Sequence, residues 1–258
     1  MFEEDDDTAL GSLYPEEPRP PTPEPSIAVY ERDEDVDGAP TAWKEMKIRL
    51  VGSHPLWGHH LWNAARAFAS YLDHASELYH DRCVLELGAG GGLPGLVAAR
   101  NGAKYVALTD YPDAELVNNL EYNIEQNLTG NQRSRVSVKV CYIWGHPVGP
   151  LLEGIPEGSK GFDLVIMSDL VFNHSQHDAL LRTCAACLTQ SEAACVLVFY
   201  THHRPHLAER DMEFFDKARE QGWCCEEIVT RQFVPMFPED GGSEEVRSTV
   251  HGWRLKRR

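Results

Sequence analysis

The sequence lacks any uninterrupted apolar run of 18 or more residues, so no segment is long enough to cross a membrane as a helix. It is also poor in basic residues: 24 Lys and Arg stand against 40 Asp and Glu, which gives a formal net charge of −16. Nucleic-acid binding depends on the neutralisation of phosphates by Lys and Arg. We therefore expect neither a membrane nor a nucleic acid as a partner of this chain.

Cysteine is scattered rather than patterned, since the seven residues show no framework of regular spacings. In a chain of 258 residues this distribution indicates reduced thiols instead of structural disulfides. Residues 1–7 include five acidic side chains, which is unlike a secretory or transit peptide. Together these features lead us to expect a cytoplasmic protein.

Complete sets of metal ligands are missing as well. Cys184-x-x-Cys187 is a single pair within a helical pattern, and two ligands do not make a metal site. The histidine pairs in 174–177 and 202–203 have no third ligand at a suitable spacing. We expect no bound metal ion, although His202 follows a strand closely enough to line a pocket for an acceptor.

Charge is distributed unevenly along the chain. Residues 1–38 contain 13 acidic residues and two arginines, and the stretch 19–25 has four prolines, which keep the backbone extended. We expect residues 1–38 to form an acidic, Pro-rich arm that is at least partly disordered, followed by one domain over residues 39–258. An arm of this charge would attract a basic protein.

The rest of the chain alternates apolar strand patterns with helical ones, which is typical of a parallel, doubly wound sheet. We expect a hairpin from 27–32 and 47–51, and then a helix over 56–79. Five later strands alternate with helices, and two more close the chain as an antiparallel hairpin. The expected strands are 83–87, 104–110, 135–142, 162–168, 194–201, 224–234 and 246–256, and the expected helices between them are 94–101, 113–127, 175–188 and 206–221. The fold class is therefore α/β, with a mostly parallel sheet of seven strands rather than the six of the dinucleotide-binding fold.

The most informative stretch is CVLELGAGGGLPG at 83–95, in which an apolar strand ends in an acidic residue and a Gly-rich turn leads into a helix. One interpretation is the dinucleotide fingerprint G-x-G-x-x-G at 90–95, with Asp110 holding a ribose. In that fingerprint the first Gly closes the strand directly, whereas here the strand already ends at Leu87. The alternative is the pattern Glu86-x-Gly-x-Gly-x-Gly, counted from the strand end. It resembles the first motif of the Rossmann-like seven-strand methyltransferases that depend on S-adenosylmethionine (SAM).

The chemistry of SAM suits this turn. SAM carries no phosphate, so the glycines need not bind an anion, but they let the backbone approach the methionyl end and the ribose. An acidic side chain nearby suits a ligand that carries an ammonium and a sulfonium. We therefore expect SAM as the cofactor, in contact with Gly88, Ala89 and Gly90.

Ligands of such sheets bind beyond the carboxyl ends of the strands, and this rule indicates four further cofactor residues. Asp110 ends the second strand, where its two carboxylate oxygens would accept both ribose hydroxyls. Trp144 ends the expected third strand and would stack on the adenine ring. Ser168 ends the fourth strand, and Trp57 starts the helix that would lie over the site, although Trp62 in the same helix is an alternative.

The methyl acceptor should meet the cofactor after the fourth strand, where Asp169 and Phe172 stand. Methyl transfer to nitrogen is an in-line displacement that requires a neutral amine, close alignment and the exclusion of water. Asp169 would orient the amine, and Phe172 would face the cationic methyl group. The competing role of Asp169 is to cap the following helix. Helix capping is also the competing role of Asp110, but Asp113 is better placed for it.

Beyond the first motif, the chain from about Leu13 to Trp253 resembles a fungal branch of the seven-strand, nicotinamide N-methyltransferase-like enzymes. The members of this branch are protein N-terminal and lysine N-methyltransferases that act on elongation factor 1-alpha. The resemblance rests on the segments YPEEP at 14–18, LWG at 56–58, ELGAGGGLPG at 86–95, YIWG at 142–145, SDLVFNH at 168–174, HRP at 203–205, PMFP at 235–238 and SEEVRSTVHGW at 243–253. The branch carries an acid-x-x-aromatic signature after the fourth strand, and this chain has Phe172 where Tyr is commoner.

The resemblance implies a SAM-dependent methyltransferase whose substrate would be the processed N-terminal Gly of elongation factor 1-alpha and the Lys next to it. Position by position, it implies cofactor contacts at Trp57, Gly88, Ala89, Gly90, Asp110, Trp144 and Ser168. We expect a monomer whose methyltransferase domain carries an N-terminal lid helix. Two other functions stay open at this point: a small-molecule N-methyltransferase with an enclosed apolar pocket, and a cofactor-binding adaptor without catalysis.

Overall fold

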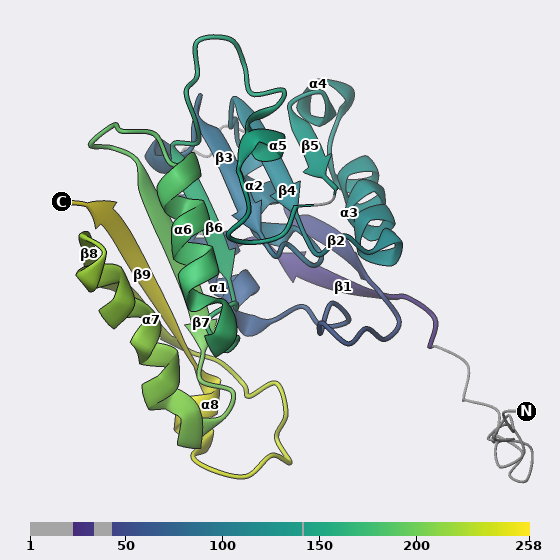
Figure 1. Ribbon diagram of the computed structural model, residues 1–258. Helices are drawn as coiled ribbons and strands as arrows, with labels where there is room; N and C mark the ends of the chain where they lie inside the picture. Colours follow the sequence, from purple (N-terminus) through teal and green to yellow (C-terminus); the bar gives the residue numbers. More distant parts are fainter. Residues whose placement is uncertain (1–22, 34–42, 141) are drawn as a thin grey trace, which may run out of the picture.

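Seven strands form one sheet in the order β5-β4-β3-β6-β7-β9-β8 (Figure 1). This computed structural model of the chain describes residues 23–33, 43–140 and 142–258. Within the sheet, β9 pairs antiparallel with both β7 and β8, while the other neighbours run parallel. The predicted α/β fold with a mostly parallel sheet and a C-terminal antiparallel hairpin is confirmed. The strands of this sheet are β3 (Cys83–Leu87), β4 (Tyr105–Thr109), β5 (Val136–Lys139), β6 (Leu164–Ser168), β7 (Cys195–Thr201), β8 (Trp223–Gln232) and β9 (Thr249–Arg257).

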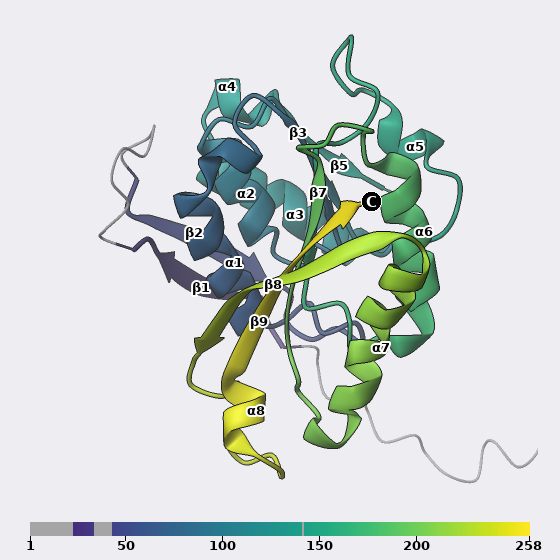
Figure 2. The same cartoon turned by 90° about the vertical axis from the view of Figure 1, so that its left-hand side faces the viewer.

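Helices cover both faces of the sheet, as Figure 2 shows. The strand residues alternate between the two faces: Val84 packs in the core beneath α1 and α2, whereas Leu85 packs in the core beneath α6 and α7. Because both faces are buried, the central strands consist of continuous apolar runs. One face carries α1 (Asn63–His74), α2 (Leu93–Arg100) and α3 (Ala114–Asn127), and the other carries α6 (His177–Cys187) and α7 (Ala208–Glu220). The short helices are α4 (Gly130–Arg133), α5 (Gly149–Leu152) and α8 (Glu244–Ser248).

The expected N-terminal hairpin is present, with β1 (Ser26–Glu31) antiparallel to β2 (Glu45–Leu50). Asparagine side chains of α3 hold β2 by hydrogen bonds to its backbone. The amide of Asn123 accepts from Arg49 N and donates to Arg49 O, and it also donates to Gly91 O at 3.0 Å. This side chain therefore connects the hairpin to the glycine turn after β3. Asn119 and Asn127, one helical turn to either side, bond to the same strand.

The expected acidic arm at 1–38 falls largely outside the described residues, which include only 23–33 of it. Within that stretch, residues 26–31 form β1. Among the described helices, none combines the length and the apolarity that a membrane span requires.

Two element boundaries near the sheet edge differ from the expectation. The helix expected over 56–79 begins only at Asn63, because Trp57 lies in a preceding turn with a φ of +64°, a left-handed conformation that a right-handed helix cannot contain. The prediction that Trp57 starts a helix is therefore wrong. The strand expected over 135–142 ends at Lys139, where its pairing with β4 ends, so Trp144 lies in the following loop and not at a strand end.

Candidate active site

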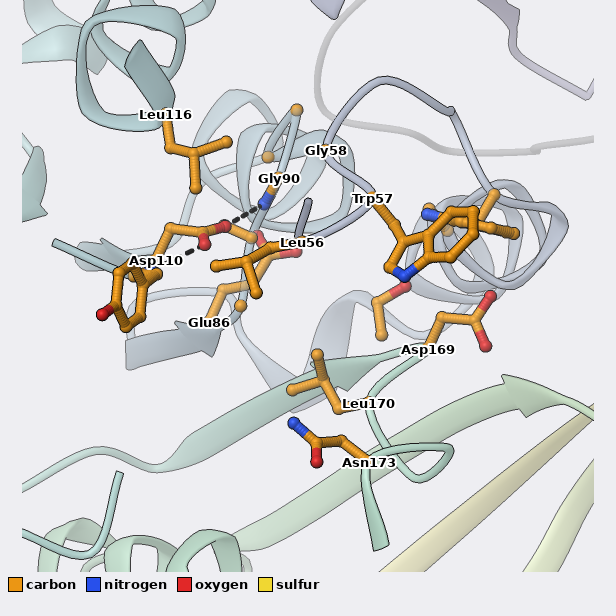
Figure 3. Close-up of a pocket in the computed structure, with 18 of the residues that line it drawn as sticks. Leu56, Trp57, Gly58, Glu86, Gly90, Asp110, Leu116, Asp169, Leu170 and Asn173 are labelled. Atoms are coloured by element: carbon orange, nitrogen blue, oxygen red, sulfur yellow. Dashed lines mark hydrogen bonds between the residues drawn. The ribbon is translucent and has the colours of Figure 1, made fainter. Parts of the chain in front are cut away.

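A cavity of about 570 Å³ lies at the carboxyl ends of β3, β4 and β6 (Figure 3). This is the edge of a doubly wound sheet where ligands bind. Several separate segments of the chain meet here, including the loop before α1 and the glycine turn after β3. Nine residues that the sequence indicated for the site line this one cavity: Trp57, Gly88, Ala89, Gly90, Asp110, Trp144, Ser168, Asp169 and Phe172.

The glycine turn brings bare backbone to the cavity wall. Gly88 and Gly90 have φ values of +61° and +54°, in the left-handed region that residues with a Cβ rarely adopt. A Cβ on Gly88 would lie 2.6 Å from a methyl carbon of Leu170, whereas a Cβ on Gly90 would have no neighbour within 4 Å. Gly90 therefore leaves room in the cavity that a side chain would occupy.

Glu86 is a buried acid with one oxygen free. Its Oε2 accepts a hydrogen bond of 2.8 Å from Gly95 N, and its Oε1 has no hydrogen-bond partner. Burial raises the pKa of Glu86 to about 8; the bond from Gly95 acts in the opposite direction, and the charge of Asp110 adds to the rise. Since Glu86 also lines the cavity, a cationic group bound there would compensate this carboxylate.

Asp110 stands at the end of β4, with both carboxylate oxygens engaged by backbone. Oδ2 accepts from Gly90 N at 2.6 Å and Oδ1 accepts from Tyr111 N at 2.7 Å. Burial raises the pKa of Asp110, while these two hydrogen bonds act to lower it. The capping role belongs to Asp113, whose side chain accepts from the first turn of α3. Each oxygen of Asp110 still has a lone pair with which to accept a ligand hydroxyl.

Aromatic side chains form part of the cavity wall. In Figure 3, Trp57 and Asp110 lie on opposite sides of the cavity. Trp57 is 48% exposed, whereas Trp62 is half-buried against Phe237, and both tryptophans line the cavity. Trp144 reaches the glycine turn from the loop after β5, since a Cβ on Gly88 would lie 3.2 Å from its ring.

Asp169 follows β6 directly and is buried. Its carboxylate bonds to Nε2 of His203 at 2.9 Å and to Thr201 N at 3.3 Å, so it does not cap the next helix. Phe172 lines the cavity three residues later. The two candidate acceptor residues therefore both line the cavity from the loop between β6 and α6.

Some expectations about this region need correction. His202 does not line the cavity, because its ring is buried and its Nδ1 lies 2.7 Å from a carboxylate oxygen of Asp211 on α7. Arg204 lines the cavity instead, and sequence reasoning missed it, although its place just after a strand could have indicated it. Gln176 and Leu116 also line the cavity and carried no signal in the sequence. Across the described ranges, no three His, Cys, Asp or Glu side chains gather as metal ligands would.

Comparison with known proteins adds independent findings. Residues 44–221 match the family described as lysine methyltransferase. The chain is 46% identical to the "Protein N-terminal and lysine N-methyltransferase EFM7" of Cryptococcus neoformans, over 99% of this chain and 90% of the relative. It is 43% identical to the protein of the same name from Schizosaccharomyces pombe, over 93% of this chain and 92% of that relative.

The fold also has solved counterparts. The crystal structure of SMU.776, a methyltransferase complexed with SAH, superposes with a TM-score of 0.59 over 82% of this chain and 53% of that chain. The two sequences are 12% identical, so this likeness concerns the fold alone.

Proposed function

Since the chain belongs to the lysine methyltransferase family, we propose that it transfers methyl groups from SAM to the N-terminal Gly and the adjacent Lys of translation elongation factor 1-alpha. The names of the relatives support a protein N-terminus and a lysine as acceptors. The choice of elongation factor 1-alpha rests on the resemblance carried by the motifs described above. In this proposal the enzyme acts as a cytoplasmic monomer.

Several features of the cavity support SAM as the cofactor. The free Oε1 of Glu86 offers a buried acceptor to an ammonium, and Asp110 offers two acceptors to a ribose. The open space at Gly90 lets a ligand approach the backbone. Trp144 and Trp57 supply flat apolar surfaces. Ser168 lines the same cavity and directly precedes Asp169 in the chain. SAM, when bound, would supply a methyl group activated by a positively charged sulfur.

The protein's own task is to present an amine to that methyl group. Asp169 and Phe172 lie beside the cavity on the loop after β6, where an amine nitrogen could align with the reacting carbon. Phe172 offers a ring face to the cationic methyl group. Apolar side chains of the cavity wall, among them Leu170, would exclude water from the reacting atoms.

One observation favours a protein acceptor over a small molecule. The cavity mouth is rimmed by apolar side chains that are about half exposed: Leu56 at 49%, Trp57 at 48%, Tyr111 at 56% and Ile143 at 46%. An enclosed pocket would bury such groups around a small ligand. An open apolar rim suits the end of an extended chain, and the acidic residues 1–38 would help to attract a basic factor.

The test is methyl transfer from tritiated SAM to recombinant elongation factor 1-alpha with a processed N-terminal Gly. We expect label in the N-terminal peptide of that factor, on the α-amine and on the adjacent Lys. A factor whose N-terminus is acetylated should keep only the lysine label, and a factor with Lys→Arg at that position should keep only the N-terminal label. These two substrates separate the two acceptor groups.

The alternatives predict other results in the same assay. Label that appears only in the small-molecule fraction of a cell extract would identify a metabolite methyltransferase. SAM binding by calorimetry without transfer to any acceptor would leave a cofactor-binding adaptor. Either result would contradict the proposed function.

A further inference from the structure

The carboxylate of Asp169 is turned toward the residues that end and follow β7. Its Oδ2 accepts a hydrogen bond of 2.9 Å from Nε2 of His203, and its Oδ1 accepts a longer one of 3.3 Å from Thr201 N. The side chain of Asp169 is 4% exposed, and in Figure 3 it points away from Leu170 and Asn173. His203 is therefore the side chain that directs this carboxylate.

The backbone of Asp169 adopts a rare conformation, which contacts with β7 must hold in place. Its φ of +57° lies in the left-handed region, which Asp adopts more readily than most residues but still rarely. Its N–H donates to Phe199 O at 2.7 Å, so β7 holds the backbone as well as the carboxylate. A residue in such a conformation persists only where its surroundings fix it.

Charges on several elements surround the ring of His203. Burial lowers its pKa, but the charge and the hydrogen bond of Asp169 and the charge of Asp211 raise it, Arg204 opposes them, and the net result lies above the ordinary value. The ring of Trp62 packs against it edge-to-face at 4.7 Å. A charged imidazole in this position makes a charge-assisted hydrogen bond to Asp169.

The other nearby titratable groups have partners of their own. Asp211 lies 2.7 Å from His174 through one oxygen and 2.7 Å from His202 through the other. His60 packs against Trp62, the ring that also meets His203. Asp169 is thus the carboxylate that contacts His203 directly.

A lone carboxylate beside an amine works against methyl transfer. It stabilises the protonated ammonium and so raises the pKa of the amine, whereas the reaction needs the free lone pair of nitrogen. A positive charge on the far side of the carboxylate offsets this effect. The imidazole of His203 stands in that position relative to Asp169.

We propose that His203 is a positioning residue of the methyl-acceptor site, which fixes the direction of Asp169 and offsets its charge so that a peptide amine binds without being trapped as an ammonium. This inference rests on the proposed function. In the transfer step the nitrogen lone pair forms the N–C bond and the electron pair of the C–S bond stays on sulfur. The N–H proton that the product loses before a second transfer passes to solvent, and His203 does not take it.

The first test is the pH profile of kcat/KM for H203Q with a peptide that carries the processed N-terminal Gly-Lys sequence of elongation factor 1-alpha. Gln keeps a donor for Asp169 but has no positive charge. We expect the rising limb of the profile to shift upward by about one pH unit, with about a tenfold loss near neutral pH and recovery in alkaline solution. The dissociation constant for SAM should not change.

The matched control is H206Q, since His206 is an exposed histidine of the same segment, two residues beyond Arg204. Its profile should superpose on that of the wild type. An unshifted profile for H203Q, or a loss of the same factor at every pH, would overturn the inference, because a merely structural role predicts a uniform loss. No transfer by the wild type at any pH would instead contradict the proposed function.

A second variant tests the pairing by a measurement that does not depend on turnover. In D169N the carboxylate charge is absent, so NMR of histidine-labelled protein should show His203 titrating at a lower pH than in the wild type. The rising limb of the pH profile of any remaining activity should shift to lower pH, opposite to the shift in H203Q. If His203 titrates identically in the wild type and in D169N, the charge pairing is refuted even where H203Q fails to fold.

Discussion

The Oδ2 atom of Asp110 accepts a hydrogen bond of 2.6 Å from the backbone N–H of Gly90. The end of β4 thereby sets the position of the glycine turn that follows β3. One carboxylate thus has two tasks, since it holds the turn and also faces the cavity. The strands meet at this edge because their parallel pairing places successive carboxyl ends side by side.

Substitution of Asp110 tests whether its carboxylate holds the cofactor. D110A should raise the dissociation constant for SAM by about 100-fold, because two hydrogen bonds to a charged acceptor contribute roughly 3 kcal/mol. Isothermal titration calorimetry measures this change, and circular dichroism checks that the fold survives. An unchanged affinity would refute the assignment of the ribose to Asp110.

Glu86 should make stability depend on pH in an unusual direction. Its pKa is raised from 4.5 to about 8, so between these values the folded protein keeps a proton that the unfolded chain has released. The free energy of unfolding should therefore fall as pH rises through this window. E86Q should lack this contribution to the pH dependence. Thermal unfolding of both proteins at several pH values measures the difference. We expect E86Q to have the higher Tm above about pH 8 and to bind SAM more weakly; parallel Tm curves would contradict this account.

Gly90 and Gly91 provide a matched pair of substitutions. G90A places a methyl group in open space at a cost of about 1 kcal/mol from its left-handed backbone, so it should lower SAM affinity much more than stability. G91A places a Cβ 2.5 Å from a methyl carbon of Ile48 in the hairpin, so it should mainly lower stability. Calorimetric affinities and urea unfolding of the two variants check this contrast, and a stability loss in G90A as large as that in G91A would contradict it.

Asn123 should couple the hairpin to the glycine turn. N123A removes three hydrogen bonds to the backbone of Arg49 and Gly91, which we expect to lower the free energy of unfolding by about 2–3 kcal/mol. SAM affinity should fall by a smaller factor, since Gly91 adjoins Gly90. N118A, at an exposed position on the same helix, is the control and should behave as the wild type. Equal stability of N123A and N118A would show that these bonds contribute little.

The helix boundary at Asn63 shows where local patterns mislead. Residues 56–79 have a helical spacing of apolar side chains, and yet Trp57 turns left-handed, its N–H donating to His54 O. The loop before Asn63 then lines the cavity and packs through Trp62 against Phe237. Propensity is a weak prior in such a segment, because tertiary packing overrides it.

The sequence by itself determined the fold class and the place of the candidate site. Continuous apolar runs such as residues 164–167 require burial on both faces, and the Glu86-to-Gly92 pattern places a bare backbone turn at a strand end; both signals are local in the chain. Only the tertiary structure decided that Asp169 faces His203 and that Glu86 keeps one oxygen free, as it also decided that Asn123 joins the hairpin to the glycine turn. The members of the Asp169–His203 and Asn123–Gly91 pairs lie 34 and 32 positions apart, and the free oxygen depends on everything packed around Glu86. Such relationships arise from the packing of distant elements, which no local pattern of residues encodes.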